Sequence, residues 1–63
     1  MNTPTDHDVY FEVTRLGTTA KVAAIDGATG IEVTVVGPAN AAPSDLQQLA
    51  LAKLKARLAK ESR

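Results

Sequence analysis

Few residues of this 63-residue chain have side chains that could bind a metal or catalyse a reaction. The single histidine, His7, lies between Asp6 and Asp8, and imidazole and carboxylate groups can together bind a divalent metal ion. Three consecutive residues near a chain end make a poor closed coordination shell, and terminal segments are commonly disordered. We therefore expect residues 1–8 to form a flexible tail, and we predict no metal site.

The sequence contains no pattern typical of a catalytic or cofactor site. A serine nucleophile needs a positioned base, and His7 lies in the predicted tail. The lack of cysteine excludes disulfides and thiolate chemistry. No glycine-rich phosphate-binding motif occurs, and so short a chain leaves little room for a ligand pocket of ~300 Å³ or more. We predict a protein that is not an enzyme and that binds no cofactor.

Positive charge is concentrated at the C-terminal end, although seven basic residues balance seven acidic ones overall. Residues 1–52 contain two basic and six acidic residues, whereas residues 53–63 contain five basic and one acidic. Lys53, Arg57 and Lys60 align along one flank of the predicted C-terminal helix and could contact phosphates. Such cations also complement a helix dipole, and zero net charge gives no overall attraction for nucleic acid. Nucleic-acid binding is therefore the alternative function, not the leading one.

Three runs of alternating apolar and polar residues predict an antiparallel meander. The runs are VYFEVTRL (9–16), AKVAAID (20–26) and IEVTVV (31–36). Gly17-Thr18 suits a type II′ turn, and the loop at 27–30 is rich in turn residues. Both turns place apolar residues on one face, which we expect to be buried. That face contains Val9, Phe11, Val13, Val22, Ala24, Ile31, Val33 and Val35.

The opposite face of the predicted sheet is mixed rather than polar. It combines charged and hydroxyl side chains with the apolar residues Tyr10, Leu16, Ile25 and Val36. Contiguous apolar patches mark interfaces, whereas single exposed apolar residues are common. The sequence leaves both interpretations open for this face.

The composition of residues 45–60 predicts a helix, because this segment contains strong helix formers and no glycine, proline or β-branched residue. Ser44 and Gln47 fit a capping box at its start. Leucines 51, 54 and 58 gather on one side, which should lie on the sheet. A second stripe has heptad-like spacing and would allow two helices to approach closely: Leu49, Ala52, Ala56 and Ala59.

The small size of the chain favours self-association. A chain of this length buries only ~60% of the surface that its unfolded form exposes, and disulfides are excluded. Self-association as a homodimer is therefore one expectation, and the second helical stripe is one candidate for its contact. Alanine also fills exposed helix positions simply because it is the best helix former, and this alternative remains open.

Three segments of the chain, which cover the predicted strands and part of the helix, resemble the sequences of a family of short uncharacterised bacterial proteins. The likeness is carried by VYFEVTRLG, KVAAIDGATG and VTVVGPANAAPSDLQQLALAKL, and it spans residues 9–58. The shared pattern is VYFE-x-TR-x-G, then AID-x-ATG, then VGPA before a leucine-rich helix. Gly27 stands where the family pattern suggests proline, and either residue suits a turn. The resemblance implies a free-standing β-β-β-α domain without an established activity, and it adds no catalytic residue.

We therefore predict an α+β fold in which residues 9–63 form one domain: a three-stranded antiparallel β-meander with one C-terminal helix on one face. No apolar run approaches the ~20 residues of a membrane span, and the N-terminal residues lack the features of a secretory signal. We expect a cytoplasmic protein with no membrane partner. Its leading function is a protein–protein interaction module that self-associates or binds another protein. In topology alone it also resembles the strand and final-helix portion of double-stranded-RNA-binding domains, which belongs to the alternative function.

Overall fold

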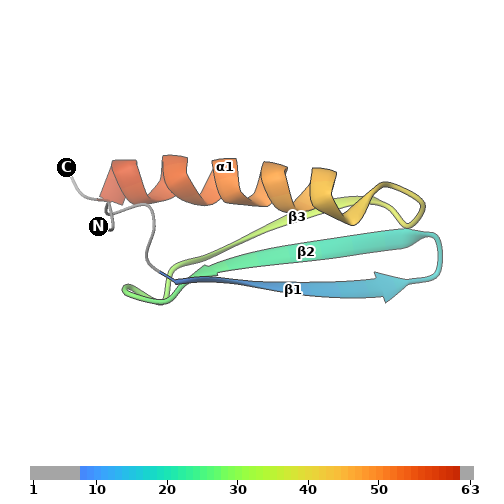
Figure 1. Ribbon diagram of the computed structural model, residues 1–63, viewed down its shortest axis with the longest axis horizontal. Coiled ribbons are helices and arrows are strands. Elements are labelled where there is room, and N and C mark those ends of the chain that lie inside the picture. Colours follow the sequence, from blue (N-terminus) through green and yellow to red (C-terminus); the bar gives the residue numbers. More distant parts are fainter. Residues whose placement is uncertain (1–7, 62–63) are drawn as a thin grey trace.

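The computed structural model describes residues 8–61, which form three strands followed by one helix (Figure 1). The strands β1 (Val9–Leu16), β2 (Thr19–Asp26) and β3 (Glu32–Pro38) form one antiparallel sheet in the order β1-β2-β3. The helix α1 (Pro43–Glu61) lies across one face of this sheet. The predicted α+β fold, a meander covered by a C-terminal helix, is therefore confirmed.

The predicted N-terminal tail lies outside the described residues except for Asp8, and so does His7. Asp8 directly precedes β1, and its carbonyl oxygen accepts a hydrogen bond from the Gly27 amide at 2.8 Å. The hydrogen bonding of the sheet therefore begins one residue before β1.

The first hairpin has the turn and register that the sequence predicts. Gly17 has a φ of 60°, whereas Thr18 has a negative φ, and this combination defines a type II′ turn. The turn places Leu16 opposite Thr19. Because side chains alternate along each strand, this pairing brings the apolar residues of β1 and β2 onto one face.

The second hairpin keeps the same face apolar. Gly30 has a φ of 78°, a left-handed conformation that glycine adopts without steric cost. The Asp26 amide donates to the Ile31 carbonyl at 2.8 Å, which closes the loop. Ala24 consequently lies opposite Val33, as predicted from the loop length.

The hydrophobic core lies between the sheet and α1. Its buried members come from β2, β3 and the helix: Ala20, Val22, Ala24, Val33, Leu46, Ala50 and Leu54. Partly buried residues pack around this cluster: Val9, Phe11, Ile31, Val35, Ala41 and Leu58. Leu51, predicted to face the sheet, is only half-buried. The predicted contact between the apolar sheet face and the helical leucines is therefore confirmed in its main features.

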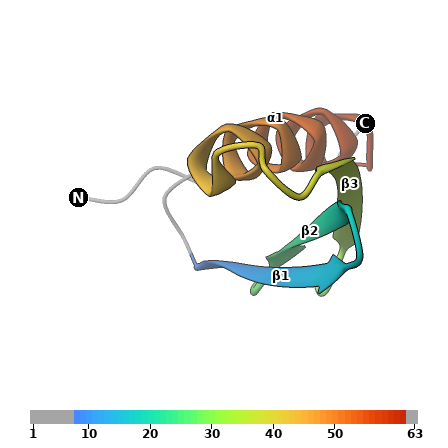
Figure 2. The same ribbon diagram turned by 90° about the vertical axis from the view of Figure 1, so that its right-hand side faces the viewer.

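Val13 departs from the predicted buried face. It lies opposite the fully buried Val22, yet 45% of its surface is exposed. The helix contacts β2 and β3 far more than β1, and β1 is the strand farthest from α1 in both views (Figure 2). The prediction that Val13 is buried is therefore wrong, because the helix lies mainly over β2 and β3, and Val9 and Phe11 are the β1 residues that pack against the core.

The position of α1 follows from the end of β3. Residues 39–42 are the whole connection between β3 and the helix, so α1 must begin beside β3. Leu46 packs directly on Gly37, where an added Cβ atom would lie 2.7 Å from Leu46 Cδ2. A Cβ atom at this distance would force the end of the Leu46 side chain to shift, so glycine permits this close approach without rearrangement. The short connection and Gly37 together favour placement of the helix over β2 and β3.

The helix begins earlier than the sequence suggests. Pro43 is its first residue, and the Ala42 carbonyl accepts a hydrogen bond from the Leu46 amide at 3.4 Å. Ala42 therefore occupies the N-cap position, and the predicted cap at Ser44 is wrong. Proline suits the first helical position because its φ is already helical and its missing N–H has no partner there.

Leu54 should contribute more to stability than any exposed leucine of the same helix. Leu54→Ala removes a fully buried side chain from the centre of the core, and such substitutions cost about 2–5 kcal/mol. We expect a large loss in the free energy of unfolding, measured by urea denaturation followed by circular dichroism. Leu49→Ala is the matched control, because Leu49 is exposed and its loss should change stability by at most about 0.5 kcal/mol. Equal effects of the two substitutions would contradict the packing of α1.

Candidate interaction surfaces

Exposed apolar side chains are concentrated on the sheet rather than on the helix. Among the described residues, the large exposed ones are Tyr10 (57%), Val13 (45%), Leu16 (70%), Val36 (65%) and Leu49 (60%). Three of the five belong to β1, the strand that α1 leaves uncovered. Val13 lies on the helix face and Tyr10 and Leu16 on the opposite face, so exposed apolar side chains flank β1 on both sides, and this strand is the first candidate surface.

The predicted helix–helix stripe lies on accessible positions of α1. Its four members are exposed: Leu49, Ala52, Ala56 and Ala59. They follow one side of the helix, whereas the core is formed by Leu46, Ala50 and Leu54 on the other side. Alanine adds little apolar area, so Leu49 is the only large side chain of the stripe. The helix–helix interface stays a prediction.

Two of the three cations predicted to contact phosphate have partners within the chain. Lys53 Nζ donates a hydrogen bond to the Thr34 carbonyl oxygen at 2.8 Å. Arg57 Nε lies 3.0 Å from Glu61 Oε2, one helical turn further along. Lys60 is exposed in the last turn. The positive flank is therefore partly neutralised by Glu61, and one of its cations binds the sheet.

The Lys53 contact also protects the outer edge of β3. The Ala39 amide donates to the Thr18 carbonyl at 2.8 Å, so odd-numbered residues of β3 direct their backbone groups toward β2 and even-numbered ones direct them outward. Among the outward groups, the Thr34 carbonyl is occupied by Lys53, and Pro38 has no N–H. Proline and lysine are devices by which natural sheets prevent edge pairing.

The open face of the sheet does not collect its apolar residues into one patch. Tyr10 lies opposite Ile25 near one end of the sheet. Leu16 and Val36 lie toward the other end, on the separate outer strands β1 and β3. Glu12 lies between Tyr10 and Leu16 along β1, and it is exposed. This face therefore offers two small apolar areas with polar residues between them.

Asp26 is the charged residue that is completely buried among those described. Its Oδ2 atom accepts hydrogen bonds from the Thr29 amide at 2.9 Å and from the Thr29 hydroxyl at 2.7 Å. Aspartate at the start of a loop commonly binds backbone groups ahead of it in this way. The sequence predicts a turn at Asp26 but not the burial of its side chain. The signal available in the sequence was a threonine three residues after the aspartate.

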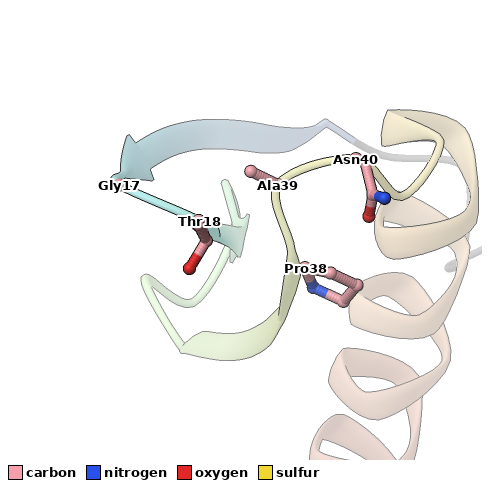
Figure 3. A pocket seen from close by; sticks show the side chains of 5 residues that line it. All are labelled: Gly17, Thr18, Pro38, Ala39 and Asn40. Atoms are coloured by element: carbon pink, nitrogen blue, oxygen red, sulfur yellow. The ribbon is translucent and has the colours of Figure 1, made fainter.

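A hollow of about 380 Å³ lies between the first hairpin turn and the segment after β3 (Figure 3). The length of the chain predicts little room for a pocket of ~300 Å³ or more, and the hollow exceeds this volume. Its walls are formed by Gly17, Thr18, Pro38, Ala39 and Asn40. None of these side chains carries charge, and four of the five residues are exposed. The hollow therefore supplies neither an acid or base nor a buried polar group for a ligand.

The acidic residues of the described part of the chain are dispersed. Glu12 and Glu32 lie on the outer strands β1 and β3, with β2 between them. No group of three or more His, Cys, Asp or Glu side chains within residues 8–61 could hold a metal ion. In the same residues, no helix is both long and apolar enough to cross a membrane.

The fold and its surfaces define a small α+β domain whose helix packs mainly on two of its three strands. A family model described as a domain of unknown function (DUF6898) matches residues 6–61. The chain belongs to this family, and the resemblance to proteins without an assigned activity is confirmed at that level. The curated proteins and the solved structures gave no match to the chain.

Asp26 should act through the turn that it closes. Asp26→Ala removes the acceptor of two hydrogen bonds from Thr29, and we expect a loss of about 1–3 kcal/mol in the free energy of unfolding. Asp26→Asn keeps a carbonyl oxygen at the same place and should lose clearly less. Chemical denaturation of both variants measures the difference. If asparagine were as damaging as alanine, the carboxylate charge rather than the turn geometry would be the important property.

Proposed function

We propose that this protein is a small cytoplasmic interaction module that self-associates as a homodimer and has no catalytic chemistry of its own. The observation that carries this proposal is the incomplete covering of the sheet. The helix packs on β2 and β3, and β1 retains three exposed large apolar side chains, Tyr10, Val13 and Leu16. A second protein surface would remove these side chains from water, which is favourable in proportion to the apolar area buried.

The composition of the core supports the same function. Three of the seven buried core residues are alanines, Ala20, Ala24 and Ala50, so the interior contributes few large side chains. Small domains without disulfides or metals are commonly reinforced by oligomerisation. A binding event that involves only the folded state adds its free energy to the stability of the fold. Self-association therefore supplies both a use for β1 and additional stability.

Nucleic-acid binding is less well supported than self-association. Of the three candidate cations, Lys53 binds the Thr34 carbonyl and Arg57 pairs with Glu61. Base stacking in single-stranded recognition uses aromatic side chains, and Tyr10 is the one aromatic residue on the open sheet face. These features leave few free groups for phosphates or bases.

The molar mass of the intact chain tests self-association directly. Size-exclusion chromatography with light scattering should give twice the 6.6 kDa of one chain, with a monomer appearing on dilution. The variant Ala52→Glu, Ala56→Glu places charge on the helical stripe, and we expect it to remain dimeric because the larger exposed side chains lie on β1. A monomer at high micromolar concentration for the unmodified chain would refute the proposal.

A titration with duplex DNA and duplex RNA tests the alternative function. We expect no binding even at low salt, where phosphate contacts are strongest. Fluorescence anisotropy of a labelled duplex measures this, and the variant Lys53→Gln, Arg57→Gln, Lys60→Gln is the matched control. Binding that weakens with added salt and is lost in this variant would favour the nucleic-acid function instead.

A further inference from the structure

Within residues 8–61, the outer edge of β1 pairs with no other strand. The Gly27 amide donates to the Asp8 carbonyl, so even-numbered residues of β1 direct their backbone groups toward β2. Odd-numbered residues, from Val9 to Arg15, therefore direct theirs away from the sheet. No proline interrupts this strand, and β3 has the Lys53 and Pro38 protection that β1 lacks. An open strand of this kind is a template for pairing with another strand.

The side chains at this edge are also available. Val13 and Arg15 are exposed on the face that carries the helix, and Tyr10 and Leu16 are exposed on the opposite face. A strand added beside β1 would contact side chains on both faces, since alternate residues of a strand point to opposite sides. The open edge and the apolar side chains thus belong to one surface.

We infer that β1 pairs antiparallel with β1 of a second copy, about a twofold axis at Val13, so that the two sheets join into one of six strands. This inference rests on the proposed self-association and names the surface responsible for it. On the helix side, Val13 meets Val13 of the second copy and Phe11 meets Arg15. On the open side, Tyr10 meets Leu16 and Glu12 meets Thr14.

This register follows from charge and from apolar contact. Phe11 beside Arg15 is a favourable cation–π arrangement, and Tyr10 beside Leu16 covers the two most exposed large apolar side chains of β1. Moving the axis to Glu12 would place two carboxylates directly opposite each other, which is destabilising. Moving it to Phe11 would leave Leu16 without a partner. The axis at Val13 avoids both losses.

The self-complementarity of this strand identifies the second copy as the partner. With the axis at Val13, the outward-facing residues give three backbone-bonded pairs: Val13 with Val13, Phe11 with Arg15, and Arg15 with Phe11. Each pair exchanges two N–H···O=C hydrogen bonds. Pairing of β1 with β3 of another copy is opposed by Lys53 and Pro38. The twofold arrangement therefore uses the open edge of each copy and leaves neither one unpaired.

Disulfide formation between copies tests the register. Tyr10→Cys chains are mixed with Leu16→Cys chains under mild oxidation, and the chain has no cysteine of its own. The two positions would be about 4.5 Å apart between Cα atoms, within the range that a disulfide requires. We expect the mixed dimer to exceed either homodimer by about tenfold, as measured by mass spectrometry. A mixture of Tyr10→Cys with Val36→Cys is the matched control for random collision, because Val36 is about as exposed as Leu16.

A second measurement does not depend on cysteine chemistry. Val13→Lys places two ammonium groups opposite each other at the axis, and Val36→Lys introduces the same charge on β3, away from the proposed interface. We expect Val13→Lys to weaken dimerisation by about tenfold or more, whereas Val36→Lys leaves it unchanged. Circular dichroism confirms that each variant is folded, since both valines are exposed.

The outcomes separate this inference from the proposed function. A dimer that forms the disulfide between Tyr10→Cys and Leu16→Cys, and that is lost in Val13→Lys, supports both the β1 pairing and the proposed self-association. A dimer with no preferred bridge that persists in folded Val13→Lys overturns the β1 pairing, and self-association then stands on another surface such as the helical stripe. An unmodified chain that is monomeric at high micromolar concentration overturns both, leaving the edge of β1 to a different partner.

Discussion

The single helix packs mainly on two of the three strands, and this placement determines which side chains of the sheet stay exposed. A helix is about 10 Å across, whereas three strands with a spacing of about 4.8 Å form a wider surface. The helix packs over β2 and β3, so Val22 and Ala24 of the middle strand are completely buried. Val13, on the same face of β1, remains in contact with water. The uncovered strand is therefore a direct result of the number and width of the elements.

Small residues explain how so few large side chains can form a core. Ala20, Ala24 and Ala50 occupy buried positions, and Leu46 packs on the bare backbone of Gly37. Such residues allow the helix and the sheet to come close together, and close packing increases the number of favourable contacts per atom. The same residues limit the apolar area that folding buries. The small core and the exposed strand therefore have the same origin. Covering β1 as well would enlarge the core, but it would require additional chain.

Local patterns predict the strands, both turns and the strand register. The alternation of Phe11 and Val13 with polar residues identifies one face, and Gly17 and Gly30 fix the pairing on either side of β2. The helix is predicted by its composition, apart from its start: Pro43 rather than Asp45 is the first helical residue, and Ala42 rather than Ser44 is the N-cap. Each of these features is determined by residues that are close together in the sequence, so the sequence alone is enough to predict it.

The lateral position of the helix could not be predicted in the same way. Periodicity shows that Leu54 faces the sheet, but it does not show which strands lie beneath it. That choice depends on the short connection after β3 and on the contact of Leu46 with Gly37, which are three-dimensional relationships. Burial of Asp26 has a similar origin, because its carboxylate is enclosed when the loop folds back through Thr29. Surface assignments, including the exposed state of Val13, depend on such tertiary placement.

The protection of β3 has a consequence for how large an assembly can grow. A sheet in which both edge strands are accessible can add further molecules at each margin without limit, and such growth is the basis of cross-β fibres. Here the Lys53–Thr34 contact and Pro38 occupy two positions along one margin, so in the proposed β1 dimer further strand addition at that margin would be disfavoured. If β1 pairs as proposed, Pro38 and Lys53, which lie outside that strand, would favour a closed pair of copies over a growing fibre.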